Sequence, residues 1–397
     1  MSKIDFMSLK TIDFCDDVRD GTHDSPKHLD SGKLLITSKN IKGDSIDFEN
    51  ASYISEEDYN KINERSLVEI NDVLYSMIGT VGLVYRVDQQ PNYAIKNMGL
   101  FKIHDELKSK WLYYYLNSPK AKGKVLSMLS GSTQKFISLS NLRNLEIEFP
   151  QNIDDAKRII KICESIDKKI KLNNEINNNL FELVLNDFDD FLNKNADSEM
   201  IKLEDCVEKI NTGADAIQRA PIVDYDTGIR CIRIGDMTNS RDYHSWGFTK
   251  MTDKDFENYK LIRNDIVITR TAVNGLTYMI TDEENIVCNN GNIRLRVNNK
   301  YNPLYIYLNT KTKDFRNYID RINSETSVRP NMKVEYFTSY EIKKIDLDKQ
   351  NDFCVRAESI MKKIQNKKVE NYNLEQLRDT LLPKLMNGEI DLDNIEI

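Results

Sequence analysis

The residues that could do chemistry are scattered along this chain, and they form no recognisable catalytic set. No GxxxxGK[ST] loop is present, which argues against a P-loop nucleotide site. The four histidines lack HExxH or paired-ligand spacing, and the six cysteines include no CxxC pair. Such dispersed cysteines are typical of reduced, mostly buried thiols. We therefore predict no metal site, no cofactor and no catalytic residue in this chain.

Two fragments resemble catalytic motifs only in part. Glu341-Ile342-Lys343 is the nearest approach to a nuclease motif, but no matching upstream Asp is found. Asn302-Pro303-Leu304-Tyr305 resembles the Asn-Pro-Pro-aromatic loop of adenine methyltransferases without its second Pro. The second fragment has a simpler structural origin, because Leu304-Tyr305 belongs to an internal repeat.

Polar and basic side chains in loops after predicted strands are the remaining candidates, since such groups can reach base edges or phosphates. In the first half of the chain the candidate DNA contacts are Thr22, His23, Ser25, Lys39, Asn40, Ser76, Thr80, Asn97, Thr133, Gln134 and Lys135. In the second half they are Arg233, Asp236, Arg270, Asn274, Asn290, Asn292, Arg294, Thr326 and Arg329. Arg270 and Arg294 are the strongest candidates for guanine or phosphate contacts. Turn formation by Asn, Ser and Thr is the alternative for each polar position.

The elements that must position these residues occur twice, at a period of about 193 residues. Asn71-Asp72 precedes one strand-like run and Asn264-Asp265 precedes another. The segment 112–117 (LYYYLN) likewise matches 304–309 (LYIYLN). The constant order of these matches predicts a duplicated architecture.

Each half contains short β-like runs separated by Gly, Asn, Asp and Ser clusters, with an amphipathic helix between strands, which predicts an α+β class. The predicted strands are 34–38, 73–76, 100–103 and 145–149, then 229–234, 266–269, 293–297 and 342–347. The predicted short helices are 112–129 and 304–322.

A long stretch with helical apolar spacing follows each mixed region, from about 153 to 192 and from about 350 to 382. At 1.5 Å per residue these helices are rods roughly 45 to 60 Å long. Pro383 is expected to kink or end the second rod. Both rods carry polar seam residues, Asn173 and Asn177 in the first and Lys367 and Asn371 in the second. Antiparallel pairing would bring these together, either to fix register or as a hinge or a dock for a third helix.

The net charge of −7 is unevenly distributed. The two mixed regions, 1–150 and 206–345, together carry +1, while the rods and their flanks, 151–205 and 346–397, carry −8. Residues 93–143 and their repeat counterparts 286–336 have basic surpluses of seven and five. A matched basic surplus among Asn, Gln, Ser, Thr and Tyr favours two phosphate-facing surfaces over two solvated charge runs.

Length and composition predict a globular protein of more than one domain. A chain of 397 residues with 40% hydrophobic and 30% charged residues predicts two or three globular domains. No apolar stretch approaches the roughly 20 residues that a membrane-spanning helix needs. The N-terminal segment has no apolar core, so no signal peptide is predicted. We therefore expect a cytoplasmic protein with no membrane partner.

The sequence resembles the specificity (S, HsdS) subunit of Type I restriction-modification enzymes. The resemblance rests on the repeat of a mixed domain plus a long helix, and on the terminal segment 377–390, LRDTLLPKLMNGEI. Weaker signatures are 70–76 (INDVLYS) and 131–135 (GSTQK), before the predicted strand that precedes Pro150. The second half departs from the pattern, because 324–330 (SETSVRP) replaces the Gly-Ser-Thr-Gln loop.

The resemblance implies two target-recognition domains, 1–150 and 199–348, with a central helix at 151–198 and a C-terminal helix and tail at 349–397. The helices would pair as an antiparallel coiled-coil spacer. A specificity subunit does no chemistry itself, and each domain reads one half of a bipartite, asymmetric double-stranded DNA target. Two modification subunits would use S-adenosylmethionine to methylate adenine N6, and restriction subunits would add ATP- and Mg-dependent cleavage. The alternative is a stand-alone DNA-binding or regulatory protein whose rods dimerise it.

Overall fold

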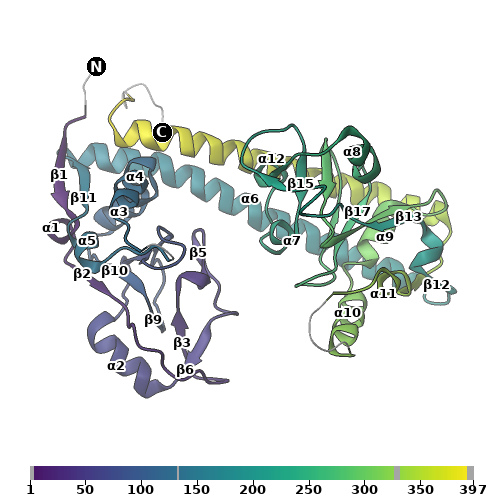
Figure 1. The fold of residues 1–397 in the computed structure, drawn as a ribbon, viewed down its shortest axis with the longest axis horizontal. Coiled ribbons are helices and arrows are strands. Elements are labelled where there is room, and N and C mark those ends of the chain that lie inside the picture. The colour runs from purple at the N-terminus through teal and green to yellow at the C-terminus, as the bar shows by residue number, and fades with distance from the viewer. Residues whose placement is uncertain (1–3, 132–133, 326–330, 391–397) are drawn as a thin grey trace. The chain divides into compact units, whose positions relative to one another are not determined.

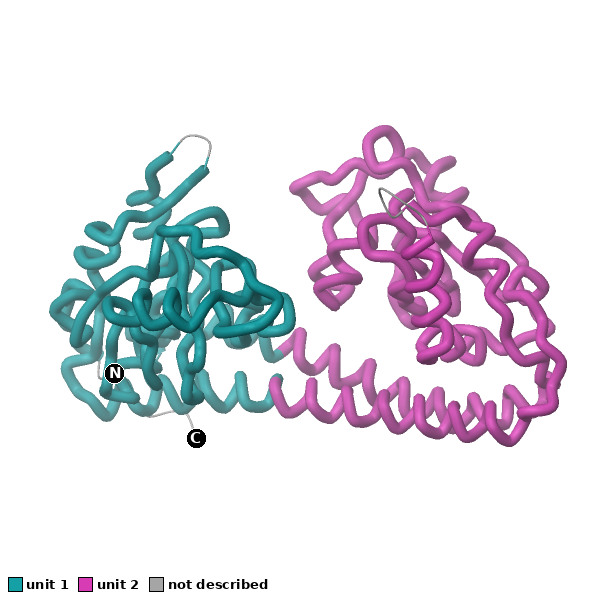
Figure 2. The backbone as a smooth tube through the Cα atoms, turned by 90° about the horizontal axis from the view of Figure 1, so that it is seen from below, with its two compact units in different colours: residues 1–170, 374–397 teal, residues 171–373 magenta. Residues whose placement is uncertain are grey.

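The computed structural model describes residues 4–131, 134–325 and 331–390. The chain forms two compact units (Figure 2), the first made of residues 1–170 with 374–397 and the second of residues 171–373. Each unit contains one sheet-rich domain together with a part of both long helices. The expected class of two mixed α/β domains with long helices is confirmed.

The first domain contains short strands and short helices (Figure 1). They are β1 (Phe6–Lys10), α1 (Thr11–Phe14), β2 (Asp17–Asp20), β3 (Lys33–Ile36), η1 (Ser38–Asn40), β4 (Ile41–Lys42), β5 (Ser45–Ile46), β6 (Ser52–Ile54), α2 (Glu56–Ser66), β7 (Val73–Ser76), β8 (Val84–Arg86), β9 (Tyr93–Ile95), β10 (Met98–Lys102), α3 (Glu106–Asn117), α4 (Pro119–Ser127), α5 (Leu139–Arg143) and β11 (Glu146–Pro150). The main sheet has the order β2-β10-β7-β8, and a smaller sheet has the order β6-β3-β9.

The second domain repeats this plan. Its elements are β12 (Met200–Lys202), η2 (Leu203–Cys206), β13 (Val207–Thr212), β14 (Ile222–Val223), β15 (Arg230–Ile232), α7 (Ile234–Thr238), η3 (Tyr243–Ser245), β16 (Phe248–Thr249), α8 (Asp253–Tyr259), β17 (Ile266–Thr269), β18 (Thr277–Met279), β19 (Ile286–Cys288), β20 (Asn292–Val297), α9 (Pro303–Asn309), α10 (Lys313–Glu325), α11 (Val334–Thr338) and β21 (Glu341–Lys343). Its main sheet, β13-β20-β17-β18, corresponds strand for strand to the main sheet of the first domain. The duplication predicted from the sequence is therefore present in the structure, since both domains have the same main sheet.

The central strands of each main sheet are buried on both faces, which explains their continuous apolar runs. Val73 and Tyr75 of β7 contribute to one core cluster, while Leu74 between them contributes to another. In the second domain Ile266 of β17 likewise faces one cluster and Val267 faces another. Each main sheet is thus a layer between two apolar cores.

A buried acid at the start of each central strand is also duplicated. Asp72 accepts a hydrogen bond from Lys102 Nζ at 2.7 Å, and Asp265 accepts two from the Arg296 guanidinium at 2.7 Å each. The Asn before each acid has a left-handed φ, 73° for Asn71 and 71° for Asn264. The Asn-Asp motif therefore forms a turn and a buried ion pair in both domains.

The two long helices are α6 (Ile153–Lys194) and α12 (Leu347–Met386). Within each unit the segments of the two helices pack antiparallel. Residues later in α6 contact residues earlier in α12. In the first unit Arg378 Nη1 lies 3.0 Å from Asp167 Oδ1, and in the second unit Arg356 Nη2 lies 3.2 Å from Asp187 Oδ2. Figure 2 shows the paired segments side by side.

The polar seam predicted from the sequence forms inside this pairing. Asn173 is fully buried and donates through Nδ2 to Asn371 Oδ1 at 2.8 Å. Lys367 Nζ donates to Asn173 Oδ1 at 3.0 Å, and Asn371 Nδ2 donates to Asn174 Oδ1 at 2.8 Å. These four polar residues of the two helices thus satisfy one another, as register-fixing residues do. Asn177, the remaining predicted seam residue, is also buried, but its Oδ1 has no hydrogen-bond partner among the described residues.

Two predicted helices are divided in the structure, and one of the two outcomes predicted for Pro383 is excluded. The predicted helix 112–129 is two helices, because Ser118 caps α4 and Pro119 occupies its first turn. Its counterpart 304–322 is also divided, at 310–312, between α9 and α10. Pro383 does not end α12, which continues to Met386. Leu385 and Met386 beyond the proline are buried in the core of the first unit, and this packing offsets the lost backbone hydrogen bond.

Candidate nucleic-acid interface

Strand direction gathers the predicted loop residues at one edge of each main sheet. In the first domain β10 is antiparallel to both β2 and β7, so the residues after β2, after β7 and before β10 share an edge. In the second domain the same holds for the residues after β13, after β17 and before β20. We call these two loop clusters the strand-end surfaces.

Most first-domain candidates lie on the first strand-end surface. Thr22, His23 and Ser25 follow β2, Ser76 and Thr80 lie at the end of β7 or after it, and Asn97 precedes β10. The Gly79 N–H donates to the Lys135 carbonyl at 3.4 Å, which brings Gln134 and Lys135 to the same edge. Lys39 and Asn40 join them because β3 and β9 are parallel and end together.

His23 is at the centre of a polar network on this surface. Its Nδ1 lies 2.9 Å from Asn97 Oδ1, its Nε2 lies 2.9 Å from Asp20 Oδ2, and its side chain remains 56% exposed. Asp20 also pairs with Arg65, and nearby Lys96 donates to Ser25 Oγ at 2.7 Å. Exposed donors are therefore held in fixed positions, which suits contact with base edges or phosphates.

The second strand-end surface has the same layout with different chemistry. Asp215 stands where the first domain has His23, two residues after Gly213 as His23 is two after Gly21. It accepts a hydrogen bond from Asn290 Nδ2 at 3.3 Å, as Asn97 contacts His23 in the first domain. N–H groups of Gln218 and Ile217 hold the pKa of Asp215 below its usual value, so the group is anionic. The two surfaces thus differ in charge at an equivalent position.

Arg270 makes hydrogen bonds within the second strand-end surface. Its Nε donates to the Met332 carbonyl at 3.0 Å and its Nη2 to Asn331 Oδ1 at 2.7 Å. Its Nη1 lies 3.4 Å from the Asn290 carbonyl. Arg270 therefore ties three loops of the second strand-end surface together, and its base contact remains a prediction.

Arg294 is an internal residue. Only 2% of it is exposed, and its guanidinium donates to Asn211 Oδ1 and to the carbonyls of Lys260 and Asn258. Burial lowers its pKa from the ordinary arginine value. By strand register it replaces Leu100 of the first domain, so it occupies a core position rather than a DNA-facing one.

Other predicted contacts also have internal hydrogen-bonding roles. Ser76 Oγ donates to the Thr80 carbonyl and accepts from the Leu83 N–H, which closes the turn after β7. The Arg233 guanidinium donates to the carbonyls of residues 231, 247 and 248. The candidates buried by this packing are Asn40, Ser76, Asp236, Asn274, Asn292 and Arg294. For these positions turn or core formation is the role that the structure supports.

Some candidates lie outside the described residues, and some surface residues were missed. Thr133, Thr326 and Arg329 lie outside the described residues. Sequence reasoning missed Lys96, which donates to the candidate Ser25, and Arg65, which pairs with Asp20 beside the candidate His23. It also missed Ile217, an apolar residue in a loop where only polar groups were sought. For Arg65 no local signal exists, because α2 brings it to Asp20 from 45 residues away.

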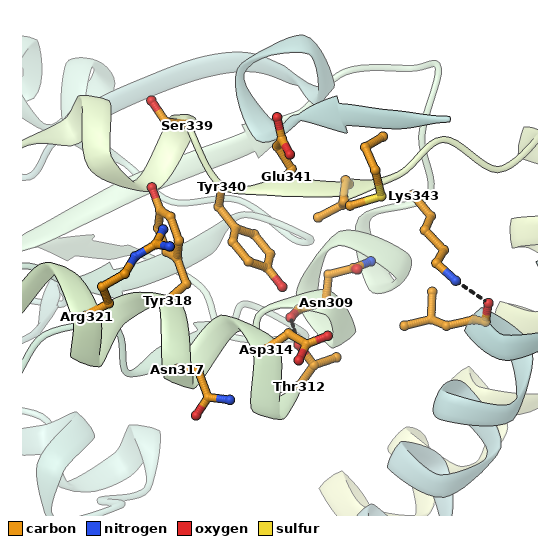
Figure 3. A pocket seen from close by; sticks show the side chains of 13 residues that line it. Asn309, Thr312, Asp314, Asn317, Tyr318, Arg321, Ser339, Tyr340, Glu341 and Lys343 are labelled. Carbon is orange, nitrogen blue, oxygen red and sulfur yellow. Dashed lines mark hydrogen bonds between the residues drawn. The ribbon is translucent and has the colours of Figure 1, made fainter. Parts of the chain in front are cut away.

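A concave feature of the second unit lies away from the strand-end surface. A pocket of about 580 Å³ lies between α10 and β21 and includes Asp314, Tyr340 and Lys343 (Figure 3). Lys343 Nζ there donates to the Leu192 carbonyl at 2.7 Å. No predicted DNA contact lines this pocket.

The cysteines and acidic groups of the described residues show no metal-binding cluster. Within the described ranges, no three His, Cys, Asp or Glu side chains gather closely enough to hold a metal ion. All six cysteines are buried as free thiols. Burial raises the pKa of Cys163, Cys206 and Cys354 to about 12, so these thiols stay protonated at neutral pH. Among the helices that the structure describes, none is both long and apolar enough to cross a membrane.

Comparison with known proteins gives one family match and several similar solved structures. Residues 24–182 match the family described as Type I restriction modification DNA specificity domain. The Type I restriction-modification S subunit from M. genitalium has 16% identity and a TM-score of 0.51, with 97% of each chain covered. This likeness shows a shared fold.

Two other solved structures are similar at lower TM-scores. The HsdS subunit from Thermoanaerobacter tengcongensis has 13% identity and a TM-score of 0.35, with 97% of each chain covered. A chain from a study of the complex assembly of the type I R-M system has 11% identity and a TM-score of 0.42, with 98% of this chain and 100% of that chain covered. Residues 24–182 are therefore similar to the Type I restriction modification DNA specificity domain, and the fold is shared over nearly the whole chain with a Type I restriction-modification S subunit.

Proposed function

We propose that this chain is the non-catalytic subunit that gives a Type I restriction-modification enzyme its DNA sequence specificity. The observation that carries this proposal is the pair of strand-end surfaces, built alike but bearing different side chains. His23 with Asn97 occupies one surface, and Asp215 with Asn290 occupies the other. Two surfaces with the same backbone arrangement but different hydrogen-bonding side chains would recognise different base sequences.

Each domain would therefore read one half of a bipartite, asymmetric target in double-stranded DNA. The long helices α6 and α12 would set the number of unread base pairs between the halves. A rigid spacer suits this role, because a change of one base pair both lengthens and rotates the DNA path between half-sites. The satisfied polar seam around Asn173 supports a fixed helix register.

The same helices would dock two modification subunits. They carry several exposed apolar side chains, Leu172, Leu183, Val355, Val369 and Leu377. A groove of about 430 Å³ between them in the second unit has an apolar floor that includes Val184 and Phe353, with charged residues at its rim. Exposed apolar surface rimmed by polar groups is typical of protein interfaces. Adenine-N6 methylation with S-adenosylmethionine, and ATP- and Mg-dependent cleavage, would belong to the partner subunits.

Methylation-sensitive sequencing of DNA from cells that hold this subunit and its modification partner tests the proposal. We expect methylated adenines in two unlike short sequences separated by a constant spacer. Methylation of one short palindrome, or methylation independent of this chain, would contradict the two-domain assignment.

A stand-alone DNA-binding protein is the second candidate, in which the exposed apolar side chains of α6 and α12 would mediate self-association. Mixing the purified chain with a modification subunit separates the two functions. A stable complex with two modification subunits per chain supports the specificity-subunit assignment, whereas self-association without such a complex supports the alternative.

A further inference from the structure

An isolated apolar side chain projects from the second strand-end surface. Ile217 lies in the turn between β13 and β14 and is 85% exposed, more than any other large hydrophobic residue in the described part of the chain. Its neighbours on this surface, such as Gln218 and Asn290, are polar and exposed. An isoleucine side chain that is exposed to water does not contribute the hydrophobic stabilisation that burial would provide.

The turn that carries Ile217 is rigidly held. Asp215 Oδ1 accepts hydrogen bonds from the N–H groups of Ile217 at 2.9 Å and Gln218 at 2.7 Å. The Ala220 N–H donates to the Asp215 carbonyl at 2.7 Å, and Arg219 Nη1 donates to Tyr259 Oη at 2.6 Å. Such a turn is ordered before any ligand arrives, so little conformational entropy is lost on binding.

The position of the turn identifies the surface that Ile217 faces. Asn290 donates to Asp215 Oδ2 and so links the turn to the loop before β20, and Arg270 links that loop to the end of β17. Ile217 therefore belongs to the loop cluster that the proposed function assigns to DNA. In the first domain the residue at the same position, four residues after Gly21, is the polar Ser25.

DNA offers one apolar group that suits such a side chain. In the major groove, thymine presents its C5-methyl group beside otherwise polar base edges. Phosphate oxygens and the ring oxygen of deoxyribose would gain nothing from contact with an isoleucine. We propose that Ile217 is a specificity-determining residue that contacts a thymine methyl group in the half-target read by the second domain. This inference rests on the proposed function.

Replacement of thymine by deoxyuridine tests the contact, because it removes only the methyl group. The complex of this chain with its modification subunits is titrated with duplexes in which each thymine of the methylated target is replaced in turn. One replacement in the second half-target should weaken binding by the wild-type complex roughly threefold to tenfold, as expected for loss of one buried methyl group. Ile217→Ala should weaken binding to the thymine duplex and abolish the difference at that position.

Ile222→Ala is the matched control, because Ile222 is also apolar and 72% exposed but lies on β14. It should keep the wild-type discrimination. The inference is overturned if Ile217→Ala retains the full deoxyuridine effect, or if it weakens all duplexes equally. A wild-type complex with no preference for its methylated motif would contradict the proposed function itself.

Discussion

At the scale of single residues, burial decides which of the predicted DNA contacts are available. The alternating pattern Ile293-Arg294-Leu295 suggests a strand with one face covered and one face exposed. On such a strand the Arg294 side chain would point to the solvent. In this domain both faces are covered, and Arg294 instead satisfies acceptors on Asn211, Asn258 and Lys260. A buried cation in such a network has a structural role, because its removal leaves several acceptors without donors.

Arg294→Leu, which restores the residue type of Leu100, should therefore destabilise the second unit by about 2 to 3 kcal/mol through unpaired acceptors. Urea unfolding measures the change. Arg263→Leu is the control, since the exposed Arg263–Asp282 pair should contribute at most about 1 kcal/mol. An Arg294→Leu protein with unchanged stability but lost DNA affinity would show that Arg294 acts in binding.

Lys311 has an enclosed ammonium group that should make stability depend on pH. Its Nζ donates to the Thr277 carbonyl at 2.7 Å and lies 4.9 Å from the centre of the Tyr307 ring. Burial, together with the nearby positive charges of Lys368 and Arg316, lowers its pKa to about 7 from the usual 10.5.

Between these two pH values the unfolded chain holds a proton that the folded protein has released, so stability should rise with pH. Below about pH 7 both states are protonated, and the cost of burying the charge is fully present. Lys311→Met should remove this rise, which urea unfolding from pH 6.5 to 9.5 measures as a difference from wild type. Lys313→Met, at an exposed position, should leave the slope intact. Equal slopes for wild type and Lys311→Met would contradict the assignment.

At the scale of elements, the long helices depend on a polar layer as well as on apolar contacts. Asn173, Lys367 and Asn371 satisfy one another across the α6–α12 seam. The apolar spacing alone leaves several registers possible, whereas a shift of one turn would bury these polar groups unpaired.

Asn173→Leu should therefore destabilise the second unit by about 1 to 3 kcal/mol, because Asn371 and Lys367 lose a partner. The double variant Asn173→Leu/Asn371→Leu should recover part of this loss while loosening helix register. Thermal unfolding measures the first effect, and cross-linking between introduced cysteines measures the second. Asn178→Leu, at an exposed position of α6, is the control. Additive effects in the double variant would argue against direct coupling.

At the scale of the whole molecule, each compact unit contains segments that are distant in sequence. The first unit contains residues from both ends of the chain, and the second contains parts of both long helices. Leu385 and Met386 near the C-terminal end of α12 are buried in the core that contains Val73 and Phe101. The first unit is thus completed by residues from near the other end of the chain.

Leu385→Ala should destabilise the first unit by about 2 to 5 kcal/mol through the cavity that it leaves. Hydrogen exchange should then accelerate in residues 4–131 while the strands of the second unit keep their protection. Leu377→Ala, on the same helix but 47% exposed, should change little. Equal acceleration in both units would show that they unfold together.

The α+β class, the duplication and the paired rods could be predicted from the sequence, because periodic apolar spacing and repeated turn residues act locally and recur along the chain. The sequence also located the loops of the strand-end surfaces, since strand ends can be predicted from turn residues. Only the tertiary structure decided which side chains of those loops remain exposed. Arg294 and Ile217 show why: exposure depends on what covers each face, and residues distant in sequence provide that cover.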